Sequence, residues 1–498
     1  MEYVIGIDIG TGSVKAVAVD LKGTSFAESQ QLYGFNSPQP GYHEQDPELI
    51  WAAFSASIKG IIHKVKTQPL TVGLSSAMHS LIAVDEDCRP LAPMMTWADN
   101  RSSSIAKRLR ATAEGMAIYK ATGTPLHAMS PLCKLIWLKE NDPVLFHKAY
   151  KFIGIKEFIW HKLFNEFVID HSIASSTGLF DIVNHTWHPA SLKMAGITAK
   201  LLSLPVPTGH TKKYDSNLPS GDIFAPGTPV TIAASDGCTA NLGSNADKPG
   251  IAAITIGTSG AVRVASNKPL PNEAAMTFSY ILDDQTYICG GPINNGGIAM
   301  QWWLKSFSGP ELSATEYLDV FKQIAAIPAG SHGMVFLPYL TGERAPIWDS
   351  ESCGTFFGVQ LQHTRDHFSR AVLEGICFAL KDVLEAVQQN SAPIIQINIS
   401  GGFVKSEVWV QVLADITGKN LAVVQSEDAS AVGAAFIAMK ANGLISSYPA
   451  PALSSEQRYQ PNPANAAIYA KNFWIYRQLY QDLKDTMHKV SAGNDQIS

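Results

Sequence analysis

Two similar turns carry the residues best suited to chemistry. Residues 5–20 read IGIDIGTGSVKAVAVD, and residues 252–267, 247 positions further on, read AAITIGTSGAVRVASN. Glycines and hydroxyls between two apolar segments let backbone N–H groups converge on anionic oxygens. Asp8 in the first copy corresponds to Thr255 in the second. One carboxylate suits Mg²⁺, whereas a second would repel phosphate. The pair predicts two loops that hold the phosphates of one nucleotide.

Two further motifs fit the same chemistry. The segment TIAASDGC (231–238) reads as a strand that ends abruptly at Asp236, and Gly237 would let a substrate approach closely. Asp236 is therefore a candidate base for an acceptor hydroxyl; the structural alternative is an Asx turn. The segment ISGGFVKSEVW (399–409) offers glycines and a helix start, where a nucleoside could lie against the backbone.

The elements that must position these residues follow from hydrophobic periodicity. The pattern predicts a hairpin at 4–19, a helix from Pro47 capped by Asp46, and a strand, a polar break and a strand within 71–85. Further segments predict an alternation of helices with strands, which implies sheets covered by helices in two related halves; the helices are expected at 103–121, 143–166, 367–389, 404–416 and from 430. With a linker at 243–250, the 498 residues are expected to form domains 1–246 and 247–498.

Bulk composition excludes several classes of protein. The formal charge is −5, with 46% hydrophobic and 16% charged residues, so a nucleic-acid partner is not expected. No apolar run approaches the roughly 18 residues that a membrane helix needs. Six scattered cysteines without a C-x-x-C pair suit reduced thiols, and the strand pattern begins too early for a secretory signal. A cytoplasmic protein is expected, and the sequence leaves a homodimer open.

The chain resembles the FGGY carbohydrate kinases, within the superfamily of actin, sugar kinases and heat-shock proteins. The resemblance rests on motifs that occur in order along nearly the full length: GYHEQDPELIW (41–51), TWADNR (96–101), SDG (235–237), FLPYLTGERAPIWD (336–349) and GGFVKSEVWVQVLADITG (401–418). It implies an α/β fold of two ribonuclease-H-like domains, with ATP and a sugar in the cleft between them.

The resemblance also implies roles for individual residues. It makes Asp236 the catalytic base. Asp8 is the expected ligand of Mg²⁺. The expected ATP contacts are Gly10, Thr11, Ser13, Lys15, Gly257, Thr258, Gly297, Gly402 and Ser406. Gly12 and Ser406 depart from residues common in relatives, which would alter hydrogen bonds without removing the site. Sugar contacts carry over to Met78, His79, Trp97, Asp99 and Arg101. Arg101 either orients Asp99 or touches the sugar, and His79 has a packed core histidine as its alternative.

A further segment narrows the choice of acceptor substrate. GTPLHAMSPLCKLIWLK (123–139) resembles the gluconokinase branch, although Ala128 departs from its usual proline. It predicts ATP-dependent phosphorylation of gluconate to 6-phosphogluconate, with His127, Ser130 and Lys134 available to the carboxylate. Met78-His79 also occurs in xylulokinases, so conversion of D-xylulose to its 5-phosphate is the alternative. A non-enzymatic alternative is an actin-like, nucleotide-gated sugar sensor.

Overall fold

A computed structural model describes residues 2–215, 223–307, 309, 314–424, 428–449 and 458–494. A mixed sheet organises the first half, in the order β13-β14-β5-β1-β2-β3. Strand β1 pairs antiparallel with β2 and parallel with β5. The strands are β1 (Val4–Ile9), β2 (Ser13–Val19), β3 (Ser25–Leu32), β5 (Val72–Ser76), β13 (Thr211–Lys213) and β14 (Pro229–Thr231). The hairpin predicted at 4–19 is present.

The second half builds a sheet on the same plan, in the order β17-β18-β16-β15-β21-β22-β23. Strand β15 again pairs antiparallel with its hairpin partner β16 and parallel with β21. The strands are β15 (Ile251–Ile256), β16 (Gly260–Ser266), β17 (Phe278–Asp283), β18 (Thr286–Ile293), β21 (Gln396–Ser400), β22 (Asn420–Val423) and β23 (Arg458–Tyr459). Both ends of the two hairpins differ by 247 positions, so the repeated sequence forms repeated structure.

Helices cover these two sheets, and several separate two-stranded pairs lie outside them. In the first half they are α1 (Pro47–Val65), α2 (Ser103–Arg110), α3 (Ala113–Thr122), α4 (Pro131–Asn141), α5 (Pro143–Lys148), α6 (Ile155–Phe164), α7 (His171–Ser175), α8 (Pro189–Ala195) and α9 (Asp236–Gly243). In the second they are α10 (Gly297–Phe307), α11 (Ala314–Ala326), α12 (Arg365–Gln388), α13 (Glu407–Thr417), α14 (Ala429–Ala441) and α15 (Ala466–Asn494). The short pairs join β4 (Glu44–Gln45) to β7 (Met94–Met95), β6 (Ile82–Val84) to β8 (Lys151–Ile153), β9 (Val168–Asp170) to β12 (Leu204–Val206), β10 (Phe180–Asp181) to β11 (Thr186–Trp187) and β19 (Val335–Leu337) to β20 (Thr355–Phe357).

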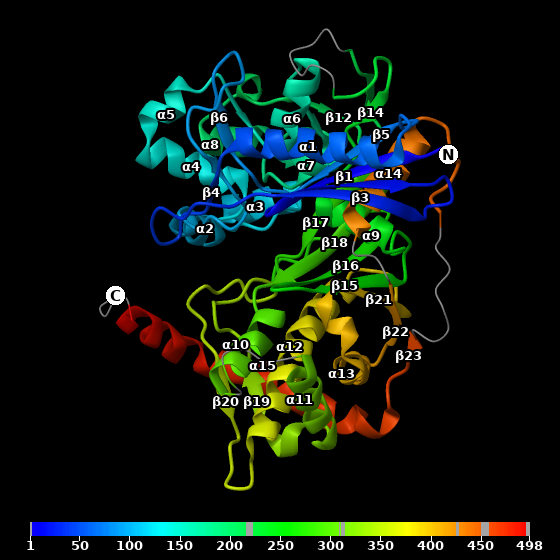
Figure 1. The fold of residues 1–498 in the computed structure, drawn as a ribbon. Coiled ribbons are helices and arrows are strands. Elements are labelled where there is room, and N and C mark those ends of the chain that lie inside the picture. The colour runs from blue at the N-terminus through cyan, green and yellow to red at the C-terminus, as the bar shows by residue number, and fades with distance from the viewer. Residues whose placement is uncertain are drawn as a thin grey trace.

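Helix α14 belongs to the second half by sequence but packs on the first sheet, beside β1 and β5 (Figure 1). Glycines make this approach possible. A Cβ added at Gly6 or at Gly73 would lie 2.6 Å from a backbone carbonyl carbon of α14. Buried apolar side chains from five elements form one continuous core across the two halves. The elements are β1, β2, α9, α14 and β17. This core joins the halves at the end of the first hairpin away from its turn, where Val4 pairs with Val19.

The helices predicted at 103–121 and 143–166 are each interrupted. Thr112 accepts a hydrogen bond from the Gly115 N–H and starts α3 as a new helix. The second helix ends at Lys148, and α6 begins after Gly154. Among the described residues, none of the helices combines the length and apolar composition required to span a bilayer.

The predicted strand that ends at Asp236 is wrong in its extent. Strand β14 stops at Thr231, and Asp236 is the first residue of α9. The Lys156 ammonium donates hydrogen bonds to the carbonyls of Ile232 and Ala234, so those carbonyls are occupied by a side chain rather than by a neighbouring strand. Asp236 therefore stands at a helix N-terminus.

Candidate active site

The first turn is held by side chains from other elements. The Gly10 N–H donates to the Ser13 carbonyl over 2.9 Å, and the Tyr33 hydroxyl donates to the Gly10 carbonyl over 2.5 Å. The Trp97 indole N–H donates to the Thr11 hydroxyl over 2.7 Å. The first turn is therefore held in place by the side chains of Tyr33 and Trp97.

Lys15 is engaged in ion pairs with protein groups. Its ammonium lies 2.7 Å from a Glu28 carboxylate oxygen and also pairs with Asp428, just before α14. The Ser13 hydroxyl accepts from the Gln30 side chain over 2.9 Å. A phosphate that takes Lys15 as its partner must therefore compete with two carboxylates.

The second turn is braced by the start of α10. The Gly297 N–H donates to the Gly257 carbonyl over 2.8 Å, and the Ile298 N–H donates to the Thr258 carbonyl over 3.1 Å. A Cβ at Gly297 would lie 2.6 Å from the Gly257 carbonyl oxygen. Gly297 thus allows the helix to seat directly on the turn.

The segment after β21 combines a packed glycine with an open one. Gly401 adopts φ +112°, and a Cβ there would lie 3.0 Å from the Ile256 carbonyl carbon. A Cβ at Gly402 would meet no other described atom within 4 Å. Ser406 caps α13 by accepting from the Trp409 N–H. Gly402 therefore presents bare backbone to open space beside the second turn.

Asp8, near the end of β1, feels the negative charge of Asp236. Burial, followed by the charges of Asp236 and Asp428, raises the pKa of Asp8 to about 7. One Asp8 oxygen is buried without a hydrogen-bond partner among the described residues. Burial also raises the pKa of Asp236, which Arg263 and the Gly237 N–H oppose. This excess of negative charge favours a cation near Asp8.

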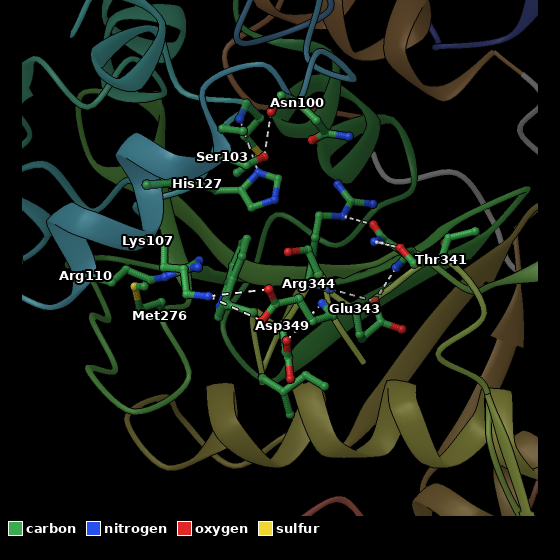
Figure 2. Close-up of a pocket in the computed structure, with 18 of the residues that line it drawn as sticks. Asn100, Ser103, Lys107, Arg110, His127, Met276, Thr341, Glu343, Arg344 and Asp349 are labelled. Atoms are coloured by element: carbon green, nitrogen blue, oxygen red, sulfur yellow. Dashed lines mark hydrogen bonds and ion pairs between the residues drawn. The ribbon is translucent and has the colours of Figure 1, made fainter. Parts of the chain in front are cut away.

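A cavity of about 1270 Å³ opens between the halves and is lined by both. Figure 2 shows Lys107, Arg110 and His127 of the first half near Glu343 and Arg344 of the second. Trp97 lines this cavity together with Thr258, and it also lines a smaller one with Gly10 and Met78. Among the described residues, Asp236 and His79 lie outside the lining of the large cavity. Trp97 thus borders both the large cavity and the smaller one beside Gly10 and Met78.

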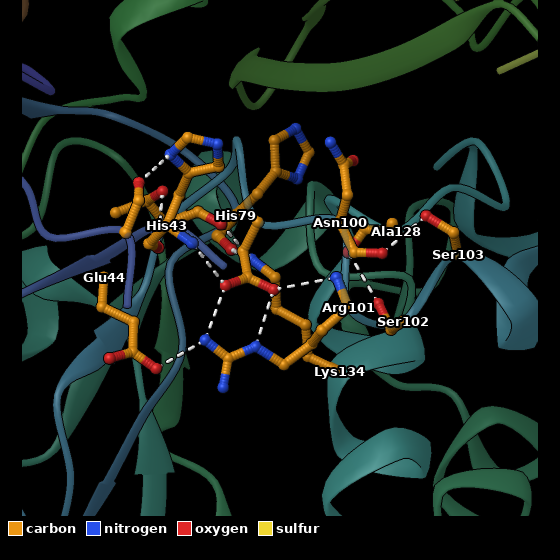
Figure 3. A network of polar contacts seen from close by, with 12 residues as sticks. His43, Glu44, His79, Asn100, Arg101, Ser102, Ser103, Ala128 and Lys134 are labelled. Carbon is orange, nitrogen blue, oxygen red and sulfur yellow. Dashed lines mark hydrogen bonds and ion pairs between the residues drawn. The ribbon is translucent and has the colours of Figure 1, made fainter. Parts of the chain in front are cut away.

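Asp99 and Arg101 pair with each other in the loop that follows Trp97. Figure 3 shows Arg101 reaching towards Glu44. Asp99 has no exposed surface, and its carboxylate accepts from the His43 N–H over 2.9 Å and from Arg101 over 2.8 and 2.7 Å. Arg101 also donates to Glu44 over 2.6 Å and stacks on Tyr42. Sugar hydroxyls were expected to donate to Asp99, but protein donors occupy its carboxylate here. Arg101 takes the orienting alternative.

His79 is neutral and offers one acceptor. Its φ is +66°, and its Nδ1 lies 2.8 Å from the Ser176 carbonyl. Burial lowers the pKa of His79 to about 3. A neutral ring whose Nδ1 donates to a carbonyl keeps Nε2 as an acceptor, here 3.5 Å from the Tyr280 hydroxyl. The ring can therefore accept a hydrogen bond from a hydroxyl.

Three residues, His127, Ser130 and Lys134, were expected to be available to the carboxylate of gluconate, and they lie in different surroundings. The Lys134 side chain is buried and donates to the carbonyls of His79 and Thr96 over 2.6 and 2.7 Å. Ser130 is also buried and caps α4. His127 does line the large cavity, and burial holds its pKa well below the usual value. The sequence could not choose among these three.

Two arginines of the second half join the candidate site without having been singled out. Arg344 donates to Asn294 over 2.7 Å and to the Ile293 carbonyl over 3.0 Å, with its guanidinium carbon 5.6 Å from the Trp97 ring centre. Arg263 lies on β16 beside Asp236, whose pKa it lowers. A charged residue inside the apolar strand AVRVAS was the available signal for Arg263.

The chain matches known proteins over nearly its full length. Residues 3–243 match the model of the FGGY family of carbohydrate kinases, N-terminal domain, and residues 252–442 match its C-terminal domain. A gluconokinase of Bacillus subtilis strain 168 is 39% identical over 98% of each chain. A xylulose kinase of Lactococcus lactis is 28% identical over the whole of both chains.

Solved structures show the same fold. A gluconate kinase from Lactobacillus acidophilus superposes with a TM-score of 0.93 at 33% identity, covering 98% of this chain and 99% of that one. A structure described as a ligand-bound xylulose kinase from the same organism has the same TM-score and identity, covering 98% and 100%. The two matches differ in the named substrate but not in similarity. The chain belongs to the FGGY family of carbohydrate kinases.

Proposed function

We propose that the protein is a gluconokinase, which transfers the γ-phosphate of ATP to a hydroxyl of gluconate and yields 6-phosphogluconate. The observation that carries the proposal is the 39% identity with the gluconokinase of Bacillus subtilis over 98% of both chains. The xylulose kinase of Lactococcus lactis shares only 28%.

Asp236 is proposed to take the proton of the attacking hydroxyl. A burial-raised pKa makes its carboxylate a better proton acceptor, and Arg263 and the Gly237 N–H favour the ionised form. The N–H of Gly237, 2.6 Å from Oδ1, also fixes the orientation of the carboxylate. The acceptor hydroxyl is thereby activated where the two halves meet.

The nucleotide is proposed to lie between the turns. Gly402 and Gly257 leave open space where a side chain would stand, which suits close approach of a ligand to the backbone. The proposed ATP contacts are Gly10, Thr11, Ser13, Lys15, Gly257, Thr258, Gly297, Gly402 and Ser406. Ser406 would contribute to the nucleotide site indirectly, by capping the start of α13.

Asp8 is proposed to hold Mg²⁺, directly or through water. Its buried, unpartnered oxygen and the neighbouring Asp236 and Asp428 charges fit a divalent cation. Mg²⁺ supplies neutralisation of phosphate charge.

The acceptor is proposed to contact Met78, His79 and Trp97, with Asp99 and Arg101 holding the Trp97 loop. Closure of domains 1–246 and 247–498 would bring the second turn, with Gly257 and Thr258, towards Asp236 and exclude water. Free cysteines throughout the described chain support a cytoplasmic location.

D-Xylulose is the second candidate acceptor. It is favoured by the structure described as a ligand-bound xylulose kinase, which superposes as well as the gluconate kinase does.

A phosphorylation screen tests the proposal. Purified protein is incubated with ATP, Mg²⁺ and gluconate, D-xylulose, L-ribulose, glycerol or L-fuculose, and ADP release is followed by a coupled assay. We expect gluconate to give the highest kcat/KM. A higher value for D-xylulose would select the second candidate, and nucleotide hydrolysis that ignores every sugar would contradict both.

A further inference from the structure

Arg263 is a charged side chain whose hydrogen-bond donors are unused. It is half-buried on β16, and the described part of the chain gives its guanidinium no hydrogen bond or ion pair within 4.0 Å. Other arginines with little exposure are used differently. Arg101 pairs with Asp99 and Glu44, and Arg370 pairs with Glu374 and donates to a tyrosine hydroxyl. Asp236 gives Arg263 an opposing charge, but N–H donors kept from water without an acceptor are costly unless a ligand supplies one.

The guanidinium lies next to the catalytic candidate. A Cβ built on Gly237 would lie 3.4 Å from Arg263 Nε, 3.8 Å from one terminal nitrogen and 3.1 Å from Met78 Cε. Arg263 and Met78 therefore both pack against Gly237, the residue that follows Asp236. Met78 is in the segment that supplies the proposed acceptor contacts.

Arg344 approaches the acceptor residues from the large cavity. It lines that cavity, and its guanidinium carbon lies 5.6 Å from the Trp97 ring centre.

Arg344 also lowers the pKa of His79 and of His127. Both arginines therefore adjoin residues that are proposed to contact the acceptor. Each has one carboxylate acting on it, Asp236 on Arg263 and Glu343 on Arg344, but the guanidinium of Arg263 keeps hydrogen-bond donors that no described residue uses.

We propose that Arg263, with Arg344 beside it, binds the carboxylate of an acidic open-chain acceptor and so determines the preference for a sugar acid over a neutral sugar. This inference rests on the proposed function and specifies its substrate class. A planar guanidinium can form two parallel hydrogen bonds to a carboxylate. Lys134, the cation suggested by the sequence, is excluded because two backbone carbonyls hold its ammonium.

The test compares gluconate with gluconamide, which keeps the hydroxyls but lacks the negative charge. We expect the wild-type protein to prefer gluconate in kcat/KM. In Arg263→Gln the gluconate value should fall by roughly 10- to 100-fold, mainly through KM, because a charged hydrogen bond is lost. The gluconamide value should fall less, because it loses only the effect of Arg263 on the charge of Asp236, which both substrates share. The preference for gluconate should therefore collapse.

Two further variants complete the design. Arg263→Lys retains the charge without the paired geometry and should restore part of the preference. Lys107→Gln is the matched control, since Lys107 lines the large cavity but pairs with the exposed Glu351. Its gluconate-to-gluconamide ratio should remain that of the wild type. Urea unfolding and ATP calorimetry report whether each variant is folded.

The outcomes separate the two proposals. If the wild type phosphorylates D-xylulose but not gluconate, the proposed function fails. If it phosphorylates gluconate but shows no preference over gluconamide, or if Arg263→Gln lowers both substrates equally, the carboxylate contact is refuted. Should Arg263→Gln fail to fold, the wild-type preference and its reduction in Arg263→Lys still decide the question.

Discussion

Replacing Gly433 by alanine tests how closely α14 is packed. Gly433 lies within α14, where alanine is normally favoured over glycine by about 1 kcal/mol. A Cβ there would lie 2.7 Å from the carbonyl carbon of Thr239 in α9, against an ordinary contact of 3.4 Å or more. A backbone group cannot rotate away, so α14 must shift by at least 0.7 Å, the difference between these distances.

That shift also loosens contacts with Gly6 and Gly73 on the first sheet. Overpacking of this kind costs about 1–3 kcal/mol, which exceeds the gain in helix propensity. We expect Gly433→Ala to lower the free energy of unfolding by about 1–2 kcal/mol. Kinase activity should fall as well, because Ser430 of α14 donates a hydrogen bond to the Asp236 carbonyl over 3.2 Å.

Urea unfolding followed by circular dichroism and tryptophan fluorescence measures the effect. Gly34→Ala is the control, since a Cβ at Gly34 meets no other described atom within 4 Å. An unchanged or raised urea midpoint for Gly433→Ala would refute the inference that close backbone contact fixes the position of α14.

Three other substitutions give equally specific outcomes. Asp236→Ala should lower sugar phosphorylation by at least roughly 100-fold while ATP still binds; turnover near wild type in the coupled assay would remove Asp236 from its role. Gly402→Arg should block the nucleoside side of the cleft, and unchanged ATP affinity by calorimetry would reject that placement. Burial raises the pKa of Glu157 to about 8 from 4.5, so unfolding lets this carboxyl ionise and stability falls as pH rises between those values. Glu157→Gln should flatten that fall in urea midpoints between pH 5 and 8, and an unaltered slope would contradict the assignment.

The sequence predicted the features that depend on local chemistry. Both hairpins and their turns, including the interval of 247 positions, follow from glycines flanked by apolar strands. Helix α1 begins where Asp46 and Pro47 indicated. The interruptions at Thr112 and Gly154 were missed because long apolar patterns hid short capping signals.

Charge pairing across distant segments was beyond the sequence. Asp99 looked like a free acceptor, but its partners come from a backbone N–H of His43 and from Arg101. Lys134 looked like a cleft cation and is instead held by two carbonyls. Arg263 was overlooked because only the tertiary fold brings β16 to the start of α9.

The position of α14 has a consequence for synthesis on the ribosome. The strands that α14 covers are complete by Thr231, yet the helix itself begins only at Ala429. At about 5–20 residues per second, the nascent chain waits roughly 10–40 s with that face of its first sheet bare. The amino-terminal half is therefore unfinished on its own, and a fragment ending near residue 246 should aggregate where the full chain does not.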